Sequence, residues 1–383
     1  MRLYRSQQLI RQDLQAHIFS QALLDNVHNL KSLCSEKTKF CAVVKANAYG
    51  HGIRETVNIL KKADVDFFAV ASIYEAIHIK DIIRKQSILI LEPISTLYPP
   101  GHILLSAKTG FHCVISSLDT LEYVTETLSG GKAVLNLHVN IETGMGRNGV
   151  EPRYASRLID KIDQNKNTNL AGVYTHFATA DEEDLTYAYE QLDSFNEFLE
   201  QNGLKARNDI IIHAANSAAT IKMPKSHFDM VRCGIAMYGF YSRPMHDPPI
   251  ELTPAMKLQA PIVHLKKIPA GNPVSYGRSF VTERDTTVAI IPLGYADGYW
   301  RCFSNKAKMK LGDKIISVIG RVCMDQLLID VTDVPDASIG QMVTIIDNDL
   351  NSPCGIYALA ELADTICYEI PICVHAHVNR IVH

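Results

Sequence analysis

A lysine directly after a short apolar run is the residue whose position most clearly suggests chemistry. Residues Cys41–Val44 are all apolar and predict a buried strand, and Lys45 follows them in front of a turn that contains Gly50 and Gly52. Burial lowers the pKa of an ammonium group, and a neutral lysine amine can form a Schiff base with an aldehyde cofactor. A lysine whose charge simply reaches solvent is the commoner arrangement, so this interpretation needs support from the rest of the chain.

Other side chains capable of chemistry also follow or lie within apolar runs. Arg147 lies on a glycine-rich loop, His176 follows another run, and Arg232 lies inside a later one. Asn216 and Ser217 follow a run that ends in small residues, which would let a ligand approach the backbone. A turn, a core position or a helix cap would explain each residue alone. Their recurrence at equivalent strand ends favours a shared site.

Eight strand-like runs alternate with helical periodicities between about residues 26 and 239. The runs are Cys41–Val44, Phe67–Ala71, Ile88–Leu91, Phe111–Ile115, Val134–Ile141, Leu170–Tyr174, Ile210–Ala214 and Met230–Tyr238. Eight strand–helix units of this total size predict a (β/α)8 barrel, in which active groups lie at the C-terminal ends of the strands. An open doubly wound sheet is the alternative, although no G-x-G-x-x-G follows the first strand.

A second domain is expected after a proline-rich junction. Residues Tyr241–Pro254 hold four prolines, which disfavour helix and sheet interiors. Short runs rich in Val and Ile then indicate a mostly-β domain with one helix-like piece, Ile356–Ile366. These runs are Ile262–Leu265, Thr287–Pro292, Ile315–Ile319, Leu327–Val331 and Met342–Ile346. We therefore predict an α/β fold with an N-terminal barrel over residues 1–243 and a C-terminal β domain over residues 244–383.

Composition narrows the classes of function. The chain has 383 residues, 47% of them hydrophobic, and a net charge of −3 without a basic stripe, so nucleic acid and membranes are not expected partners. Residues Met1–Gln8 contain no apolar segment, and the nine cysteines include no C-x-x-C pair. Both features favour reduced thiols and a cytoplasmic location.

Nine motifs, in order along the chain, resemble the pyridoxal-phosphate-dependent alanine racemases of fold type III. They are VVKANAYGHG, ETGMGRNG, THFATAD, HAANSAA, VRCGIAMYG, VSYGRSF, IPLGYADGY, GRVCMDQ and TICYEI, spanning about residues 40–370. The resemblance implies a barrel followed by a β domain, pyridoxal 5'-phosphate as the cofactor, and alanine as the substrate. It further implies D-alanine supply for peptidoglycan and a homodimer with shared active sites.

The resemblance also implies a role for each matching residue. Lys45 would hold the cofactor and act as one base, with Tyr276 as the base on the opposite face of the substrate. Arg232 would face the ring nitrogen, and His176 would link it to the tyrosine. The remaining cofactor-binding residues would be Tyr49, Arg147, Asn216, Ser217, Gly234, Ile235 and Tyr368. Substrate contacts would come from Arg147 and Met324, with Asp325 in support and with Tyr295 and Arg301 at the entrance.

One position departs from the family pattern. Many members carry a lysine that becomes carbamylated where this chain has Asn140, and asparagine cannot carry that modification. Asn140 would bind an anion or hydrogen-bond Arg147 directly. His375 and His377 alternate on a predicted terminal strand, but no carboxylate or cysteine cluster completes a metal site, so no metal is expected.

Three other activities remain open at this point. A decarboxylase of the same fold type would carry a late Cys-Asp pair, which Cys323-Met324-Asp325 only partly matches. A racemase of broader specificity would also accept serine. A non-catalytic carrier of the cofactor would lack the β domain with Tyr276.

Overall fold

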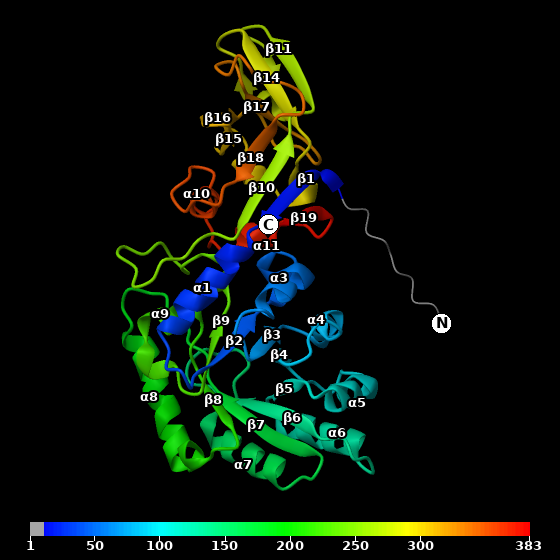
Figure 1. Cartoon of the computed structure of the whole chain (residues 1–383), viewed down its shortest axis with the longest axis vertical. Coiled ribbons are helices and arrows are strands. Elements are labelled where there is room, and N and C mark those ends of the chain that lie inside the picture. Colours follow the sequence, from blue (N-terminus) through cyan, green and yellow to red (C-terminus); the bar gives the residue numbers. More distant parts are fainter. Residues whose placement is uncertain (1–10) are drawn as a thin grey trace.

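The computed structural model describes residues 11–383, so the predictions made for residues 1–10 lie outside the described residues. The described chain forms an elongated molecule with a barrel at one end and a sheet-rich domain at the other (Figure 1). No helix in this described range is both long enough and apolar enough to cross a membrane.

Eight parallel strands form the closed barrel and confirm the predicted fold class. They are β2 (Lys39–Val43), β3 (Phe67–Val70), β4 (Ser87–Pro93), β5 (His112–Ile115), β6 (Leu135–Asn140), β7 (Thr168–Tyr174), β8 (Ile211–His213) and β9 (Met230–Cys233). Strand β9 pairs with β2 and closes the ring. Parallel strands with both faces covered are mostly apolar, which is why these runs were readable in the sequence, although β6 also carries Asn136, His138 and Asn140.

Helices surround the barrel in the expected alternation. They are α1 (Ser20–Ser32), α2 (Lys45–Tyr49), α3 (Ile53–Leu60), α4 (Ile73–Ile79), α5 (Pro100–Thr109), α6 (Leu118–Leu128), α7 (Pro152–Asp163), α8 (Thr186–Gln201) and α9 (Ser217–Lys222), with short 3-10 turns η1 (Leu204–Ala206), η2 (Pro224–Ser226) and η3 (Ile235–Tyr238). The last predicted strand, Met230–Tyr238, was too long. It ends at Cys233, and η3 begins directly after Gly234.

The second domain is built on a nine-stranded sheet in the order β11-β14-β17-β16-β15-β18-β10-β1-β19. Its strands are β1 (Arg11–Ile18), β10 (Met256–Pro261), β11 (His264–Ile268), β14 (Thr286–Ile291), β15 (Lys308–Leu311), β16 (Lys314–Val318), β17 (Leu327–Asp330), β18 (Met342–Ile346) and β19 (Val378–Val382). A small hairpin, β12 (Pro273–Val274) and β13 (Phe280–Val281), and the helices α10 (Ile356–Leu362) and α11 (Glu369–Ile372) complete it, together with the turns η4 (Tyr276–Arg278), η5 (Tyr295–Asp297) and η6 (Arg301–Phe303).

The domain assignment was wrong for the first described strand. Strand β1 pairs with β10 and β19 in the second domain's sheet, rather than belonging to the barrel. Leu14, Ala16 and Ile18 are fully buried and alternate with other residues, so the strand has the period of two expected for a sheet. That alternation was a readable signal.

Two further strand predictions for the second domain also need correction. The run Ile262–Leu265 is not one strand, because β10 ends at Pro261 and β11 begins at His264. His375 and His377 precede β19 and are not part of a strand. Their rings meet edge to face, with centroids 5.6 Å apart, in the loop before that strand.

A buried asparagine fastens the interdomain junction to the barrel helices. The Asn26 carboxamide of α1 donates to the carbonyls of Met237 (3.0 Å) and Thr253 (2.8 Å), and it accepts the Thr253 N–H (2.8 Å). The side chain is almost completely buried. These three bonds satisfy the buried carbonyl of Met237 and two backbone groups of Thr253 in the junction.

We predict that Asn26→Ala lowers the free energy of unfolding by about 1–3 kcal/mol, because it removes three hydrogen bonds and leaves the buried Met237 carbonyl without this partner. Urea denaturation of the purified protein measures this change. Asn58→Ala, at an exposed position of α3, is the control and should change stability by no more than about 0.5 kcal/mol. Equal effects of the two substitutions would contradict the assignment.

Candidate active site

The turn after β2 has an unusual backbone. Residues Ala46–Tyr49 have φ angles of 53°, 54°, 54° and 51°, and Gly50 follows at 83°. Left-handed backbone costs about 1–2 kcal/mol for each residue other than glycine. Strain of this kind persists only where the surroundings enforce it, and it is concentrated at functional sites. Lys45 stands at the start of this turn, directly beyond the end of a barrel strand.

The surroundings of Lys45 favour its neutral amine. Burial lowers the pKa of the ammonium group, and the positive charge of Arg147 lowers it further. The carboxylates of Glu75 and Glu92 oppose the shift, but the net direction is downward. The direction of this pKa shift is the one expected for a nucleophilic lysine.

Arg232 of β9 lies inside the barrel with its guanidinium surrounded by neutral acceptors. It donates to the carbonyls of Thr175 and Ala214, both at 3.0 Å, and it contacts His176 Nδ1 at 3.2 Å. Its guanidinium also lies 5.0 Å from the ring centroid of Tyr174. Within the described chain, no carboxylate forms an ion pair with this arginine. Burial lowers its pKa, while Tyr174 opposes that shift.

Three histidines continue from Arg232 through the barrel interior. Its guanidinium meets His213 Nδ1 at 2.8 Å, His213 Nε2 meets His138 Nδ1 at 2.9 Å, and His138 Nε2 meets His112 Nδ1 at 2.9 Å. A guanidinium can only donate, so His213 must accept through Nδ1 and carry its proton on Nε2. The same logic assigns the Nε2 proton to His138. The histidines thus point their lone pairs toward Arg232.

A small cradle for an anionic group lies beside the turn. Ser217 Oγ accepts the backbone N–H of Gly234 (2.8 Å), which leaves its own hydroxyl proton free to be donated. A Cβ added to Gly234 would come within 2.3 Å of the Tyr49 hydroxyl, so only glycine fits. Tyr49 and Tyr368 have ring centroids 6.2 Å apart. These hydroxyl groups suit a phosphate group.

Three further cofactor-binding predictions fall on the segments that directly follow barrel strands. Ile235 is buried directly after Gly234, at the start of η3. The Asn216 carboxamide oxygen accepts the Ala219 N–H (3.0 Å) and caps α9. His176 is surrounded by the charges of Arg232, Arg147 and Lys45, and burial first, then these charges, lower its pKa to about 3.

Arg147 is exposed on a loop whose backbone N–H groups bind the carboxylate of Glu142. Burial acts to raise the pKa of Glu142, but hydrogen bonds from the backbone N–H groups of residues 144–147 lower it overall. The sequence analysis did not single out this carboxylate. Asn140 is buried at the end of β6, and among the described residues no hydrogen bond joins its side chain to Arg147. The direct bond considered for this pair is therefore absent.

The predicted residues of the second domain form a separate group. The side chains of Tyr276, Met324 and Tyr295 are 70%, 54% and 41% exposed. Their loops are tied together, because the Tyr295 N–H donates to the Cys323 carbonyl (3.1 Å) and Ser275 Oγ donates to the Arg321 carbonyl (2.6 Å). Two more predicted residues, Arg301 and Asp325, are also exposed on this domain.

No hydrogen bond in the described residues joins Tyr276 to Lys45. Arg147, Glu75 and Glu92 act electrostatically on Lys45, whereas a second group of predicted residues is exposed on the other domain: Tyr276, Met324, Tyr295, Arg301 and Asp325. Sequence reasoning missed several residues that support the two groups. They are Glu75, His112, His138, Glu142, Arg321 and Arg380.

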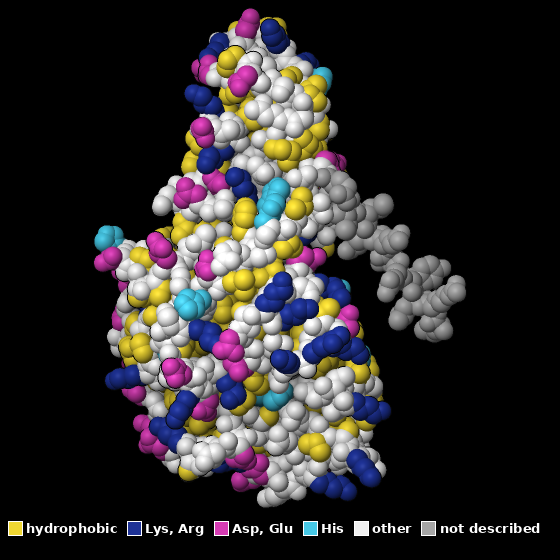
Figure 2. All heavy atoms as spheres, viewed as in Figure 1, with side chains coloured by type: hydrophobic (Ala, Val, Ile, Leu, Met, Phe, Trp, Pro, Cys, Tyr) yellow, Lys and Arg dark blue, Asp and Glu magenta, His cyan; other side chains and the backbone are white. Residues whose placement is uncertain are grey.

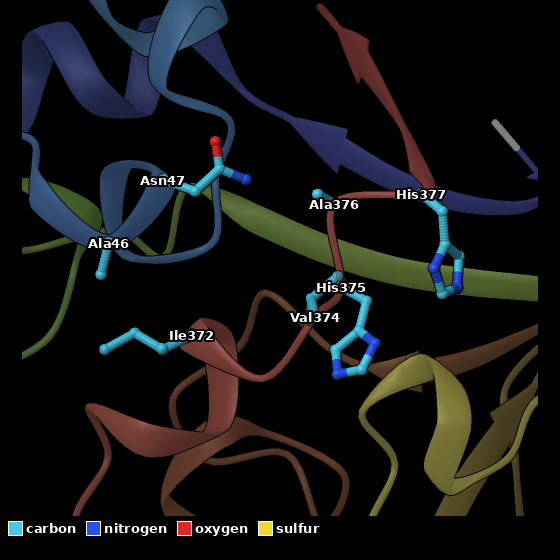
Figure 3. Close-up of a pocket in the computed structure, with 7 residues that line it drawn as sticks. All are labelled: Ala46, Asn47, Ile372, Val374, His375, Ala376 and His377. Carbon is cyan, nitrogen blue, oxygen red and sulfur yellow. The ribbon is translucent and has the colours of Figure 1, made fainter. Parts of the chain in front are cut away.

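A cavity of about 630 Å³ opens beside the turn. Figure 3 shows Ala46 and Asn47 opposite the end of α11 at Ile372 and the loop that carries Val374 to His377. His377 Nε2 lies 2.9 Å from the buried carboxylate of Asp297, so one of the two histidines already has a partner. The described residues contain no group of three or more His, Cys, Asp or Glu side chains that could hold a metal ion.

Comparison with known proteins identifies relatives along the whole length of the chain. A family model described as the alanine racemase N-terminal domain matches residues 18–242, and one described as the C-terminal domain matches residues 255–382. An alanine racemase of Halothermothrix orenii is 36% identical over 369 residues, which cover 95% of each chain.

Solved structures agree with this match. An alanine racemase of Clostridium difficile superposes with a TM-score of 0.89 at 32% identity, over 98% of this chain and 96% of that chain. An alanine racemase of Bartonella henselae, with covalently bound pyridoxal phosphate, superposes with a TM-score of 0.85 at 26% identity, over 97% of this chain and 100% of that chain.

We predict that His213 and His138 stay neutral at pH 5.5 and carry their protons on Nε2. Burial, followed by the charge of Arg232 for His213 and of His112 for His138, holds both pKa values well below 6.5. An ordinary histidine, with a pKa of about 6.5, is mostly charged at that pH. Nitrogen NMR of isotope-labelled histidine distinguishes the forms, with signals assigned by substitution. A charged ring, or a proton on Nδ1 of His213, would refute the proposed direction of the chain.

Proposed function

The chain belongs to the alanine racemase family, and we propose that it racemises alanine at a site built around Lys45 and completed by Tyr276 of a second copy. The enzyme is an isomerase that interconverts L-alanine and D-alanine with pyridoxal 5'-phosphate as cofactor. The observation that carries the site is the convergence of Lys45, Arg232 and the anion cradle at one end of the barrel, in a chain that matches the family over both domains.

The residues present fit the cofactor. The lowered pKa of the Lys45 amine suits covalent attachment to an aldehyde. Ser217, Gly234, Ile235, Tyr49 and Tyr368 would hold the phosphate, since the Ser217 hydroxyl contacts the Gly234 N–H and a side chain at position 234 would collide with the Tyr49 hydroxyl. When bound, the cofactor withdraws electrons and acidifies the Cα–H bond of the amino acid.

Racemisation requires proton removal on one face of Cα and proton return on the other. The Lys45 amine would serve one face, and the Tyr276 hydroxyl would serve the other. Arg147 would bind the substrate carboxylate through its guanidinium, and the Met324 backbone N–H would add a second donor. Tyr295 and Arg301 would narrow the entrance so that a methyl side chain is favoured. Serine, only one hydroxyl larger, is the alternative substrate.

The charge of Arg232 would select the reaction. A guanidinium donates but does not accept, so it would keep the ring nitrogen of the cofactor unprotonated. This weakens electron withdrawal by the ring and disfavours transamination. The decarboxylase alternative gains no support, because the relatives reported above over both domains are alanine racemases.

Exposed site residues support a homodimer with shared sites. Tyr276 and Met324 are largely exposed in the single chain, although their roles require them next to Lys45. A second copy placing its β domain over the barrel would bury them. The visible face of the barrel carries side chains of both charge signs (Figure 2), which suits a soluble partner better than nucleic acid. We further propose a cytoplasmic enzyme whose D-alanine enters peptidoglycan synthesis.

We predict that the purified protein converts L-alanine in deuterated water into D-alanine carrying deuterium at Cα. Lys45→Ala should reduce this rate by about 10²–10⁴ or more, since it removes an acid–base group as well as the cofactor's attachment point. Lys61→Ala, an exposed lysine after α3, is the matched control. Release of an amine would indicate a decarboxylase, and no turnover would indicate a carrier. Repeating the assay with serine measures specificity.

We predict that mixing two inactive variants restores activity. Lys45→Ala and Tyr276→Phe homodimers should each be nearly inactive. If sites are shared, every heterodimer has one site with both residues intact, so refolded mixtures should recover about a quarter of wild-type activity. A tag on one chain verifies heterodimer formation, and a mixture of two Lys45→Ala preparations is the control. No recovery despite heterodimers would place the whole site within one chain.

A further inference from the structure

The left-handed turn after Lys45 is held at its first residue by a carboxylate from another element. Glu75 of α4 accepts the Ala46 N–H through Oε1 (2.7 Å). Its other oxygen accepts the N–H of Ala71 (2.7 Å), at the end of β3. The same side chain completes the capping box of α4 with Ser72. One carboxylate thus ties the turn, the neighbouring strand and a helix start together.

The other end of the turn is held by an arginine of the second domain. Arg380 of β19 donates to the Gly50 carbonyl (2.8 Å) and also to the carbonyls of Val374 (2.7 Å), His375 (2.6 Å) and Val378 (2.7 Å). Its guanidinium therefore joins the turn to the loop that faces it (Figure 3). A Cβ on Gly50 would lie 1.8 Å from the Pro371 carbonyl oxygen, so the two backbones are in close contact.

We propose that Glu75 and Arg380 are positioning residues that hold the Ala46–Gly50 turn and thereby fix the placement of Lys45. This inference rests on the proposed function of Lys45. Glu75 acts on the peptide directly after the lysine, so a shift of that peptide moves the lysine backbone. Arg380 prevents the turn from opening at its far end.

The two contacts use opposite chemistry for a physical reason. The first N–H of a helical turn and its last carbonyl have no partner within the turn. A carboxylate accepts at the first position, and a guanidinium donates at the last. Asn47 adds a third restraint, since its Oδ1 accepts the Ile53 N–H (2.9 Å) at the start of α3.

Hydrogen exchange of the full-length enzyme with bound cofactor tests the restraint. Glu75→Gln keeps the shape of the side chain but replaces one acceptor oxygen with an NH2 group that faces a backbone N–H. We expect the Ala46 amide to exchange about tenfold faster in Glu75→Gln, and the 45–52 segment to exchange faster in Arg380→Gln. Glu126→Gln and Arg157→Gln, both at exposed helix positions, should leave this segment unchanged. Arg380→Lys, which keeps the charge but not the fork of donors, replaces Arg380→Gln if that variant does not fold.

Steady-state kinetics test the effect on Lys45. We expect Glu75→Gln to lower kcat for alanine about tenfold while KM changes less than twofold. The substitution would misplace Lys45, but it would leave the contacts of Arg147 and Met324 with the substrate carboxylate intact. Asn26→Ala supplies the contrast, since it should weaken the fold and leave kcat unchanged. Rescue by Glu75→Asp should be partial, because the shorter side chain cannot reach both Ala46 and Ala71.

Unchanged exchange at Ala46 in folded Glu75→Gln, or faster exchange with unchanged kcat, would overturn the inference. Either result is distinct from failure of the proposed function, which would appear as an active Lys45→Ala variant.

Discussion

The candidate site depends on keeping one guanidinium charged in the interior of a barrel. Arg232 is buried, and in the described chain no carboxylate pairs with it. Two backbone carbonyls, from Thr175 and Ala214, a neutral imidazole of His213 and the face of Tyr174 solvate its charge instead. An adjacent carboxylate would neutralise the local field. Aligned neutral dipoles stabilise the cation while preserving its positive potential, which the proposed reaction requires.

The two ends of the described chain explain how the β domain is fixed to the barrel. Strands β1 and β19 are parallel neighbours although more than three hundred residues separate them, and β1 continues directly toward α1 of the barrel (Figure 1). The same strand β19 carries Arg380, whose donors reach the Gly50 carbonyl of the barrel turn. A displacement of the β domain would therefore move Gly50, at the end of the turn that follows Lys45.

Sequence periodicity predicted the elements that are buried on both faces and missed several that are not. All eight barrel strands coincide with predicted apolar runs, because helices cover one face of each strand and the barrel interior covers the other. Strand β15 was overlooked, since Lys308 and Lys310 alternate with the buried Met309 and Leu311 and its partner β16 supplies the longer apolar run. The pairing of β1 with β19 was not predictable, because register between distant segments is set by tertiary contacts.

Motifs located the residues of the site, but not the geometry that holds them. Glu75 and Arg380 contact the turn after Lys45 from α4 and β19, and no local pattern reports such contacts. Gly50 and Gly52 marked the turn in the sequence, but the left-handed residues Ala46–Tyr49 gave no signal, because none of them is a glycine. Glycine would adopt the conformation at lower cost, but it would also leave it more easily. Ala48 and Tyr49 are buried, so their side chains pack against the core and hold the strained backbone in place. Packing and the contacts of Glu75 and Arg380 offset the backbone strain. The turn is therefore rigid, which keeps Lys45 aligned.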